Sequence, residues 1–295
     1  MNLNILSWFK SSREKIPSDG PCELHHKNGQ LKCKGTYKEG RQEGSYESYY
    51  ETGQLESKGN YKKGLKDGRW EHHYETGQLD FKGDYKDGKP DGLHEKFHKN
   101  GLLRDRRSYV EGRSEGTWEL FHENGQLKSK GGYKGGKREG PFDVYYNNGQ
   151  LRSKGSHKDD KRDGAYEAYY ETGPLESKGH YKAGKRNGHW EAFYSNGQLK
   201  LKGGYKDGNQ DASWEIFHEN GQLKSTGNYQ DNHQEGLFQE YSENGQLKVK
   251  ENYRNGKKNG PYEAYDDNGR LKSKGAFKYG ELDGPFELYK DGVLQ

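Results

Sequence analysis

The chain has 295 residues, with 50 Lys and Arg against 46 Asp and Glu and a formal net charge of only +4. Hydrophobic residues make up 27% of it, which is low for an ordinary globular core, but the 13% aromatic content and the balanced charge argue against disorder. No apolar run approaches the ~18 residues of a membrane-spanning helix.

The first 19 residues lie outside the repeat that organises the rest of the chain. Leu6, Trp8 and Phe9 belong to a short apolar cluster that is followed by basic residues. The segment does not resemble a signal peptide, because no basic residue precedes the cluster and no small-residue cleavage site follows it. We interpret it as a cap on the first hairpin. The alternatives are a weak membrane or partner anchor through these three residues and a disordered tail.

A period of 24 residues runs from residue 20 to residue 295, which we interpret as one array of about eleven and a half repeats. The motif Asn28-Gly29-Gln30-Leu31 recurs with substitutions at steps of 24 residues up to Gly269, without insertion or deletion. Four glycine columns hold 40 of the 44 glycines. These glycines therefore mark turns and are not part of a flexible linker. The first hairpin contains Cys22 and Cys33, which we expect to be diagonal neighbours, a poor geometry for a disulfide.

Each unit reads as two short strands around an Asn-Gly or Thr-Gly turn, a strong hairpin signal. A two-residue turn at Thr52-Gly53 predicts that Tyr50 faces Leu55 and Tyr46 faces Gly59, so that the ring covers the glycine. A three-residue turn with a bulge predicts that Tyr49 faces Leu55. We favour the first, although Thr disfavours positive φ. The second connection, residues 62–68, reads as longer and polar.

The columns predict two different faces of the sheet. One face carries the aromatic column that contains Tyr46, together with the Leu55 and Tyr37 columns. The other carries the Glu47 column, a basic column containing Lys58, and the aromatic column that contains Tyr49. Because a hairpin cannot bury its apolar face alone, stacked hairpins must cover one another. We predict an all-β, elongated, solenoid-like array of antiparallel hairpins forming one long twisted meander sheet.

At residues 190–208 the unit resembles the bacterial variant of the MORN repeat, and the resemblance extends over roughly residues 20–295. Arrays of this unit are similar to the YwqK-family antitoxins of toxin–antitoxin systems. The resemblance implies a β-hairpin stack that serves as a scaffold or a protein-binding surface, with lipid binding also proposed. The YwqK label implies neutralisation of a cognate toxin by binding. It implies no catalytic residues.

The unit at residues 89–112 is the least regular. Arg104, Arg106 and Arg107 stand where other units read like Lys-Ser-Lys-Gly, and His94 occupies the aromatic column. One interpretation is drift in a tolerant repeat. The other is a bend or a contact patch, since Arg is favoured in interface anchors.

Residues that would indicate catalysis, metal binding or nucleic-acid binding are present but not suitably placed. His98 and His122 share a column, but adjacent units lie about 10 Å apart, too far for two ligands of one ion. The carboxylates form a repeated ladder with Lys instead of a perturbed pair in a cleft. Glu also alternates with Lys, which disfavours phosphate binding. We predict no enzyme, no catalytic residue, no metal and no cofactor.

We therefore predict a cytoplasmic, non-enzymatic binding protein. Our first hypothesis is an antitoxin or immunity-type protein that neutralises a toxin by direct contact. Alternatives are a structural or membrane-associated scaffold and an envelope interaction module. Tyr and Arg are enriched in binding hot spots, so we place partner contacts on one face of the array. The predicted contact residues are Tyr49, Phe97, Arg104, Arg106, Arg107, Phe121, Tyr145, Tyr169, Phe193 and Phe217.

Overall fold

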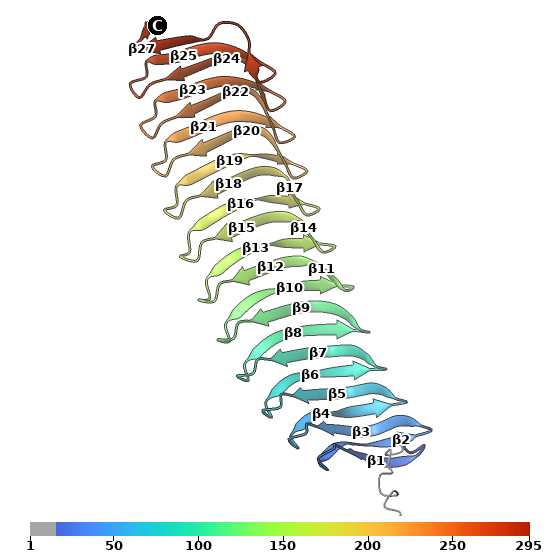
Figure 1. Ribbon diagram of the computed structural model, residues 1–295. Coiled ribbons are helices and arrows are strands. Elements are labelled where there is room, and N and C mark those ends of the chain that lie inside the picture. The colour runs from blue at the N-terminus through green and yellow to red at the C-terminus, as the bar shows by residue number, and fades with distance from the viewer. Residues whose placement is uncertain (1–15) are drawn as a thin grey trace, which may run out of the picture. The chain divides into compact units, whose positions relative to one another are not determined.

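Short antiparallel strands joined by turns build the described part of the chain (Figure 1). The structure, a computed structural model, describes residues 16–295. By internal contacts these residues divide into two compact units, one up to Leu127 with Tyr133–Gly136, the other Lys128–Gly132 with Lys137–Gln295. The boundary falls within strand β10 (Leu127–Lys134). The prediction of an all-β array of 24-residue antiparallel hairpins is confirmed.

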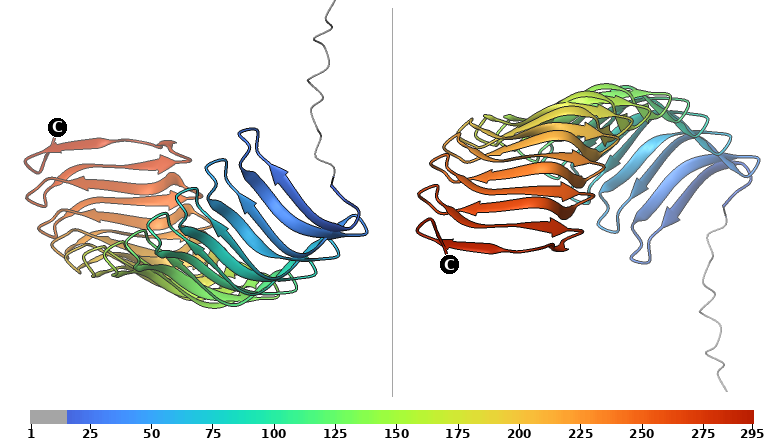
Figure 2. Two further views of the ribbon diagram at one scale, coloured as in Figure 1. Left: turned by 90° about the horizontal axis from the view of Figure 1, so that it is seen from below. Right: turned by 90° about the horizontal axis from the view of Figure 1, so that it is seen from above.

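In the first unit each strand pairs with the next one along the chain. Neighbouring strands lie side by side in Figure 1 and in both views of Figure 2. The strands are β1 (Gly20–His25), β2 (Leu31–Lys38), β3 (Arg41–Tyr49), β4 (Leu55–Lys62), β5 (Leu65–His73), β6 (Leu79–Lys86), β7 (Lys89–Phe97), β8 (Leu103–Val110) and β9 (Arg113–Phe121).

The second unit repeats this meander, with short extra strands next to some of the turns. Its strands are β11 (Lys137–Arg138), β12 (Gly140–Tyr145), β13 (Leu151–Lys158), β14 (Lys161–Arg162), β15 (Gly164–Tyr169), β16 (Leu175–Lys182), β17 (Lys185–Arg186), β18 (Gly188–Phe193), β19 (Leu199–Lys206), β20 (Asn209–Phe217), β21 (Leu223–Gln230), β22 (His233–Tyr241), β23 (Leu247–Arg254), β24 (Lys257–Tyr265), β25 (Leu271–Lys278), β26 (Glu281–Leu282), β27 (Glu287–Lys290) and β28 (Val293–Leu294).

The Asn-Gly or Thr-Gly connection is a three-residue turn, so the predicted pairing of Tyr50 with Leu55 is wrong. The Tyr50 amide donates to the Gln54 carbonyl at 2.9 Å, and only Gly53 of the three turn residues has a positive φ, 85°. Thr52 therefore fits without strain. Next to the turn, Tyr49 pairs with Leu55. A bulge then shifts the register by one residue, so that the remaining pairs are those predicted: Tyr46 with Gly59, Glu47 with Lys58 and Ser48 with Ser57.

The second connection is the tight one, which corrects the prediction of a longer loop. Lys62 pairs with Leu65, and both turn residues have positive φ, 53° at Lys63 and 81° at Gly64. Such a two-residue turn matches the twist of the flanking strands. Asp160 and Asn232 replace the glycine of this column with φ of 66° and 68°, because Asp and Asn tolerate the left-handed region.

The core is the aromatic face, which we define by the Tyr46 and Tyr61 columns. Rings of successive hairpins alternate there: Tyr46 lies 5.3 Å from Tyr61, which lies 4.9 Å from Trp70. Trp70 is 1% exposed, and Trp190 and Trp214 are also buried. Large rings thus replace the missing aliphatic side chains. The Leu55 column is not part of this face, because paired side chains share a face and Leu55 pairs with Tyr49.

Candidate interaction surface

The predicted aromatic contact residues all end a strand beside a three-residue turn. They are Tyr49 in β3, Phe97 in β7, Phe121 in β9, Tyr145 in β12, Tyr169 in β15, Phe193 in β18 and Phe217 in β20. Every one of these side chains is half-buried. The repeat brings them to the same edge of the sheet within each unit, on the face that also carries Glu47 and Lys34. We call this the charged face.

A cation lies over the rings of Tyr49, Phe97, Phe193 and Phe217 on the charged face, and the hydroxyls of Tyr49, Tyr145 and Tyr169 donate to carboxylates. The Tyr49 hydroxyl donates to the Glu47 carboxylate, and the Lys34 ammonium lies 6.0 Å from the ring centroid. Phe97 lacks the hydroxyl but has Lys82 at 5.3 Å. The Tyr49 hydrogen bond and then Lys34 hold the pKa of Glu47 below its usual value, so the carboxylate is ionised at neutral pH.

Ion pairs join successive hairpins in a ladder along the charged face. Glu47 lies in register between Lys34 and Lys58, but its contact is with Lys34 of the preceding hairpin, at 2.9 Å. The same pairing recurs as Lys58–Glu71, Lys82–Glu95, Lys130–Asp143, Lys154–Glu167, Lys178–Glu191, Lys202–Glu215, Lys250–Glu263 and Lys274–Glu287, at 2.6–3.7 Å. The ladder therefore connects hairpins and orders the charged face.

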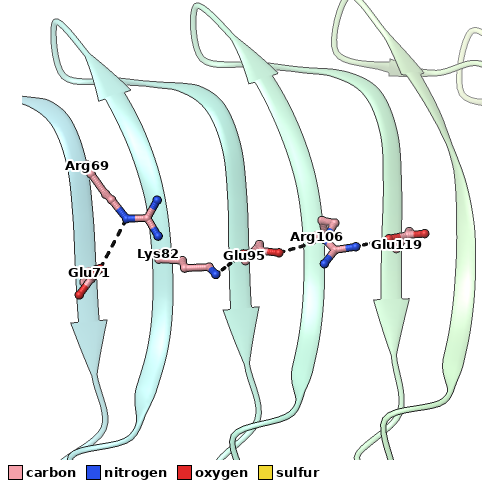
Figure 3. A network of polar contacts seen from close by, with 6 residues as sticks. All are labelled: Arg69, Glu71, Lys82, Glu95, Arg106 and Glu119. Carbon is pink, nitrogen blue, oxygen red and sulfur yellow. Dashed lines mark hydrogen bonds and ion pairs between the residues drawn. The ribbon is translucent and has the colours of Figure 1, made fainter.

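Arg106 makes the ladder continuous in the irregular hairpin (Figure 3). Its guanidinium contacts Glu95 at 3.0 Å and Glu119 at 3.2 Å, and Glu95 also contacts Lys82 at 2.6 Å. Burial alone raises the pKa of Glu95, but Lys82 and Arg106 outweigh burial and keep the pKa below its usual value. Figure 3 shows these side chains aligned across neighbouring strands, with Arg69 and Glu71 beside them.

The three predicted arginines do not form one patch. Arg106 lies on the charged face, whereas Arg107 lies on the aromatic face and is bonded to Asp105 at 2.6 Å. Arg104 is the bulged residue of β8, 3.8 Å from Asp80. Only Arg106 therefore joins the aromatic contact residues on the charged face.

Two columns that sequence reasoning missed also hold the hairpins together. The Tyr50 hydroxyl donates to the His73 carbonyl of the next hairpin at 2.7 Å, and His98 Nε2 makes the same bond to the Phe121 carbonyl at 3.1 Å. At the opposite edge, the Glu43 carboxylate accepts the Lys63 amide at 2.7 Å. The 24-residue period identifies both columns, but the sequence of a single repeat does not show which atoms of the next hairpin these side chains contact.

Leu6, Trp8 and Phe9, the predicted anchor, lie outside the described residues. Cys22 and Cys33 are diagonal neighbours as expected, and no disulfide joins them. Within residues 16–295, no three His, Cys, Asp or Glu side chains are grouped so that they could hold a metal ion. In the same range no helix is long and apolar enough to cross a membrane.

Comparison with known proteins matches most of the chain to one family. The family described as MORN repeat variant matches residues 18–39, 42–63, 66–87, 114–134, 138–159, 162–183, 186–207, 210–231, 234–255 and 258–279. Residues 88–113, which contain Arg104, Arg106 and Arg107, lie between two matched segments. Comparison with curated proteins gives no match.

Two solved structures are similar over most of this chain. The crystal structure of TcdB2-TccC3-Cdc42 is 13% identical with a TM-score of 0.20, over 91% of this chain and 15% of that chain. The Photorhabdus luminescens Tc holotoxin pore is 12% identical with a TM-score of 0.18, over 93% of this chain and 18% of that chain. The chain thus spans under a fifth of either length, and at these TM-scores neither likeness carries an argument.

Proposed function

Because the chain belongs to the MORN repeat variant family, we propose that it is a non-enzymatic antitoxin or immunity-type protein that neutralises a cognate toxin by binding it in the cytoplasm. A repeat-based role in protein binding or scaffolding follows from the family. The step to a toxin rests on the resemblance of the repeat unit to the YwqK antitoxins.

The observation that supports binding is the composition of the charged face. It presents half-buried rings such as Tyr145 and Tyr169, each fixed by neighbouring charged groups, at regular strand ends. Rings that are already ordered lose little conformational entropy on binding. Tyr is also among the residues that dominate binding energy at protein interfaces.

The test is affinity capture of the tagged full chain from its native cells at near-physiological salt, with mass spectrometry. We expect one stoichiometric protein that is toxic when expressed alone and harmless when co-expressed with the chain. Tyr145→Ala with Tyr169→Ala should abolish both capture and protection. Tyr279→Ala, an exposed Tyr on a tight turn, is the matched control. Capture of membranes, or flotation of the chain with liposomes, favours a membrane-associated scaffold instead.

A further inference from the structure

Three consecutive hairpins of the second unit carry a Lys-Arg pair directly after the tight turn. The pairs are Lys137-Arg138 in β11, Lys161-Arg162 in β14 and Lys185-Arg186 in β17, and all six side chains are exposed. The next hairpin has Asn209-Gln210 at these positions. We call Arg138, Arg162 and Arg186 the arginine row.

Aromatic rings hold two guanidinium groups of this row in place. Arg186 lies 4.4 Å from the Trp190 ring and 5.3 Å from the Tyr205 ring, and its Nη1 donates to the Tyr205 hydroxyl at 3.0 Å. Arg162 lies 4.9 Å from Tyr166. Arg162 and Arg186 therefore lie on the aromatic face, opposite the charged face, and their side chains are oriented before any ligand binds.

These oriented cations have no carboxylate partner. Within residues 16–295, no Asp or Glu oxygen forms an ion pair with Arg162 or Arg186, although acidic residues lie nearby in the chain. Those acids are engaged elsewhere: the Asp163 carboxylate accepts the Ala183 amide at 2.9 Å, and the Asp159 carboxylate pairs with Lys137 at 2.9 Å. A planar guanidinium that is fixed and lacks an anion suits bidentate binding of an external carboxylate or phosphate.

The spacing of the row indicates which anion fits. Equivalent residues of successive hairpins are two strands apart, about 9.6 Å. Residues seven apart on an α-helix lie on the same side with a separation of about 10.5 Å. An extended chain repeats a face only about every 6.7 Å. A continuous phosphate chain would also meet Asp159 and Asp160, which lie between Arg138 and Arg162 in the sequence.

We propose that the arginine row binds an acidic helix of a partner protein, with carboxylates that recur every seven residues along one face. Such a helix would lie across the strands of the second unit and pair one carboxylate with each guanidinium. This surface is separate from the charged face, so the proposal stands whether or not the partner is a toxin.

The test uses the full chain and a labelled synthetic helical peptide with three Glu at seven-residue intervals, measured by fluorescence anisotropy. An isomer with the same composition, but with the three Glu on different faces, should bind at least about tenfold more weakly. Equal binding of the two peptides, or tighter binding of a single-stranded oligonucleotide of the same charge, would overturn the proposal.

Two variants keep the test independent of folding. Arg162→Lys with Arg186→Lys retains the charge and the ring contacts, as Lys66 does over Trp70 at 4.1 Å, but removes the planar fork. We expect this variant to fold and to bind the first peptide several-fold more weakly than the wild type. The second variant, Arg162→Gln with Arg186→Gln, should bind that peptide at least about tenfold more weakly. Lys66→Gln in the first unit is the control and should bind normally. Unchanged binding by both folded double variants contradicts the proposal.

Discussion

The guanidinium of Arg107 is bonded to the carboxylate of Asp105, two residues earlier on the same face of β8, with Nη2–Oδ2 at 2.6 Å and Nε–Oδ1 at 2.8 Å. Most hairpins have Gly and Ser at these two positions. The Arg107 side chain occupies the space that glycine leaves for a ring of the next hairpin. Trp118 Nε1 is accordingly buried without an acceptor, whereas Trp70 Nε1 donates to the Asn60 carbonyl at 3.0 Å.

We predict that Arg107 and Asp105 are strongly coupled in stability. Arg107→Gly alone leaves a buried carboxylate without its partner and should lower the free energy of unfolding by about 1–3 kcal/mol. Adding Asp105→Ser restores the common pattern, lets Trp118 settle over glycine, and should recover at least the wild-type stability. A double-mutant cycle in urea measures the coupling. Additive effects of the two substitutions would show that the pair is independent.

Arg107 stands in the column of Gly35 and Gly59. In this column, the loss of stability on replacing glycine by alanine should be larger where an aromatic ring lies closer to the glycine. A Cβ atom at Gly59 would lie 2.3 Å from the Trp70 ring, whereas at Gly35 it would lie 3.2 Å from Tyr46. Gly59→Ala must displace a buried indole and should cost about 1–3 kcal/mol, as overpacking does. Gly35→Ala is the matched control and should cost less than about 1 kcal/mol. Equal shifts of the two urea midpoints would argue against this account.

One buried and three half-buried histidines should make the fold sensitive to mild acid. Burial lowers the pKa of His94, which donates through Nε2 to the Asp84 carbonyl at 2.7 Å, and burial also lowers the pKa of His72, His73 and His157. Protonation favours the unfolded state when the folded pKa is the lower one. The stability contribution of the neutral rings is therefore complete above about pH 6.5 and is lost as the pH falls below it.

The variant that checks this removes the most buried of these rings. Phe81 fills the space beside the small His94 ring, 5.2 Å away, so Phe81→Ser with His94→Trp restores the common arrangement of Ser57 and Trp70. Urea midpoints at about pH 7.5 and about pH 5.5 should fall less for this double variant than for the wild type. A drop of the same size in both proteins would assign the acid sensitivity to other groups.

The sequence predicted the pairs inside a hairpin better than the contacts between hairpins. A period of 24 and the glycine columns were enough to predict the strands and the register of Tyr46 with Gly59. They did not show that Trp70 of the next hairpin is the ring that covers Gly59, because every inner strand has two neighbours in register. The same ambiguity hides the contact of Glu47 with Lys34.

The two turns were assigned the wrong way round for a related reason. Both connections contain glycine, but only in the tight turn does the residue before glycine also have a positive φ. The tight turn puts Lys63, Ala183 and Tyr279 at positive φ, and none of these residue types favours that region. Asp87, Asp207 and Asn255 stand in the same column and do suit positive φ. The column is therefore mixed, and the twist of the flanking strands imposes the conformation at its other residues.

Completing the ion-pair ladder should stabilise the second unit slightly. The ladder is interrupted where Thr226 pairs with Gln239. Thr226→Lys with Gln239→Glu recreates the pair seen at Lys202 and Glu215, which lie 2.8 Å apart. Because such groups are largely solvated, we expect a gain of about 0.2–1 kcal/mol at low salt that disappears near 1 M salt. Thr226→Lys with Gln239→Lys is the matched control and should destabilise by a similar amount. If the gain in the free energy of unfolding does not change with salt, it arises from side-chain packing and not from the ion pair.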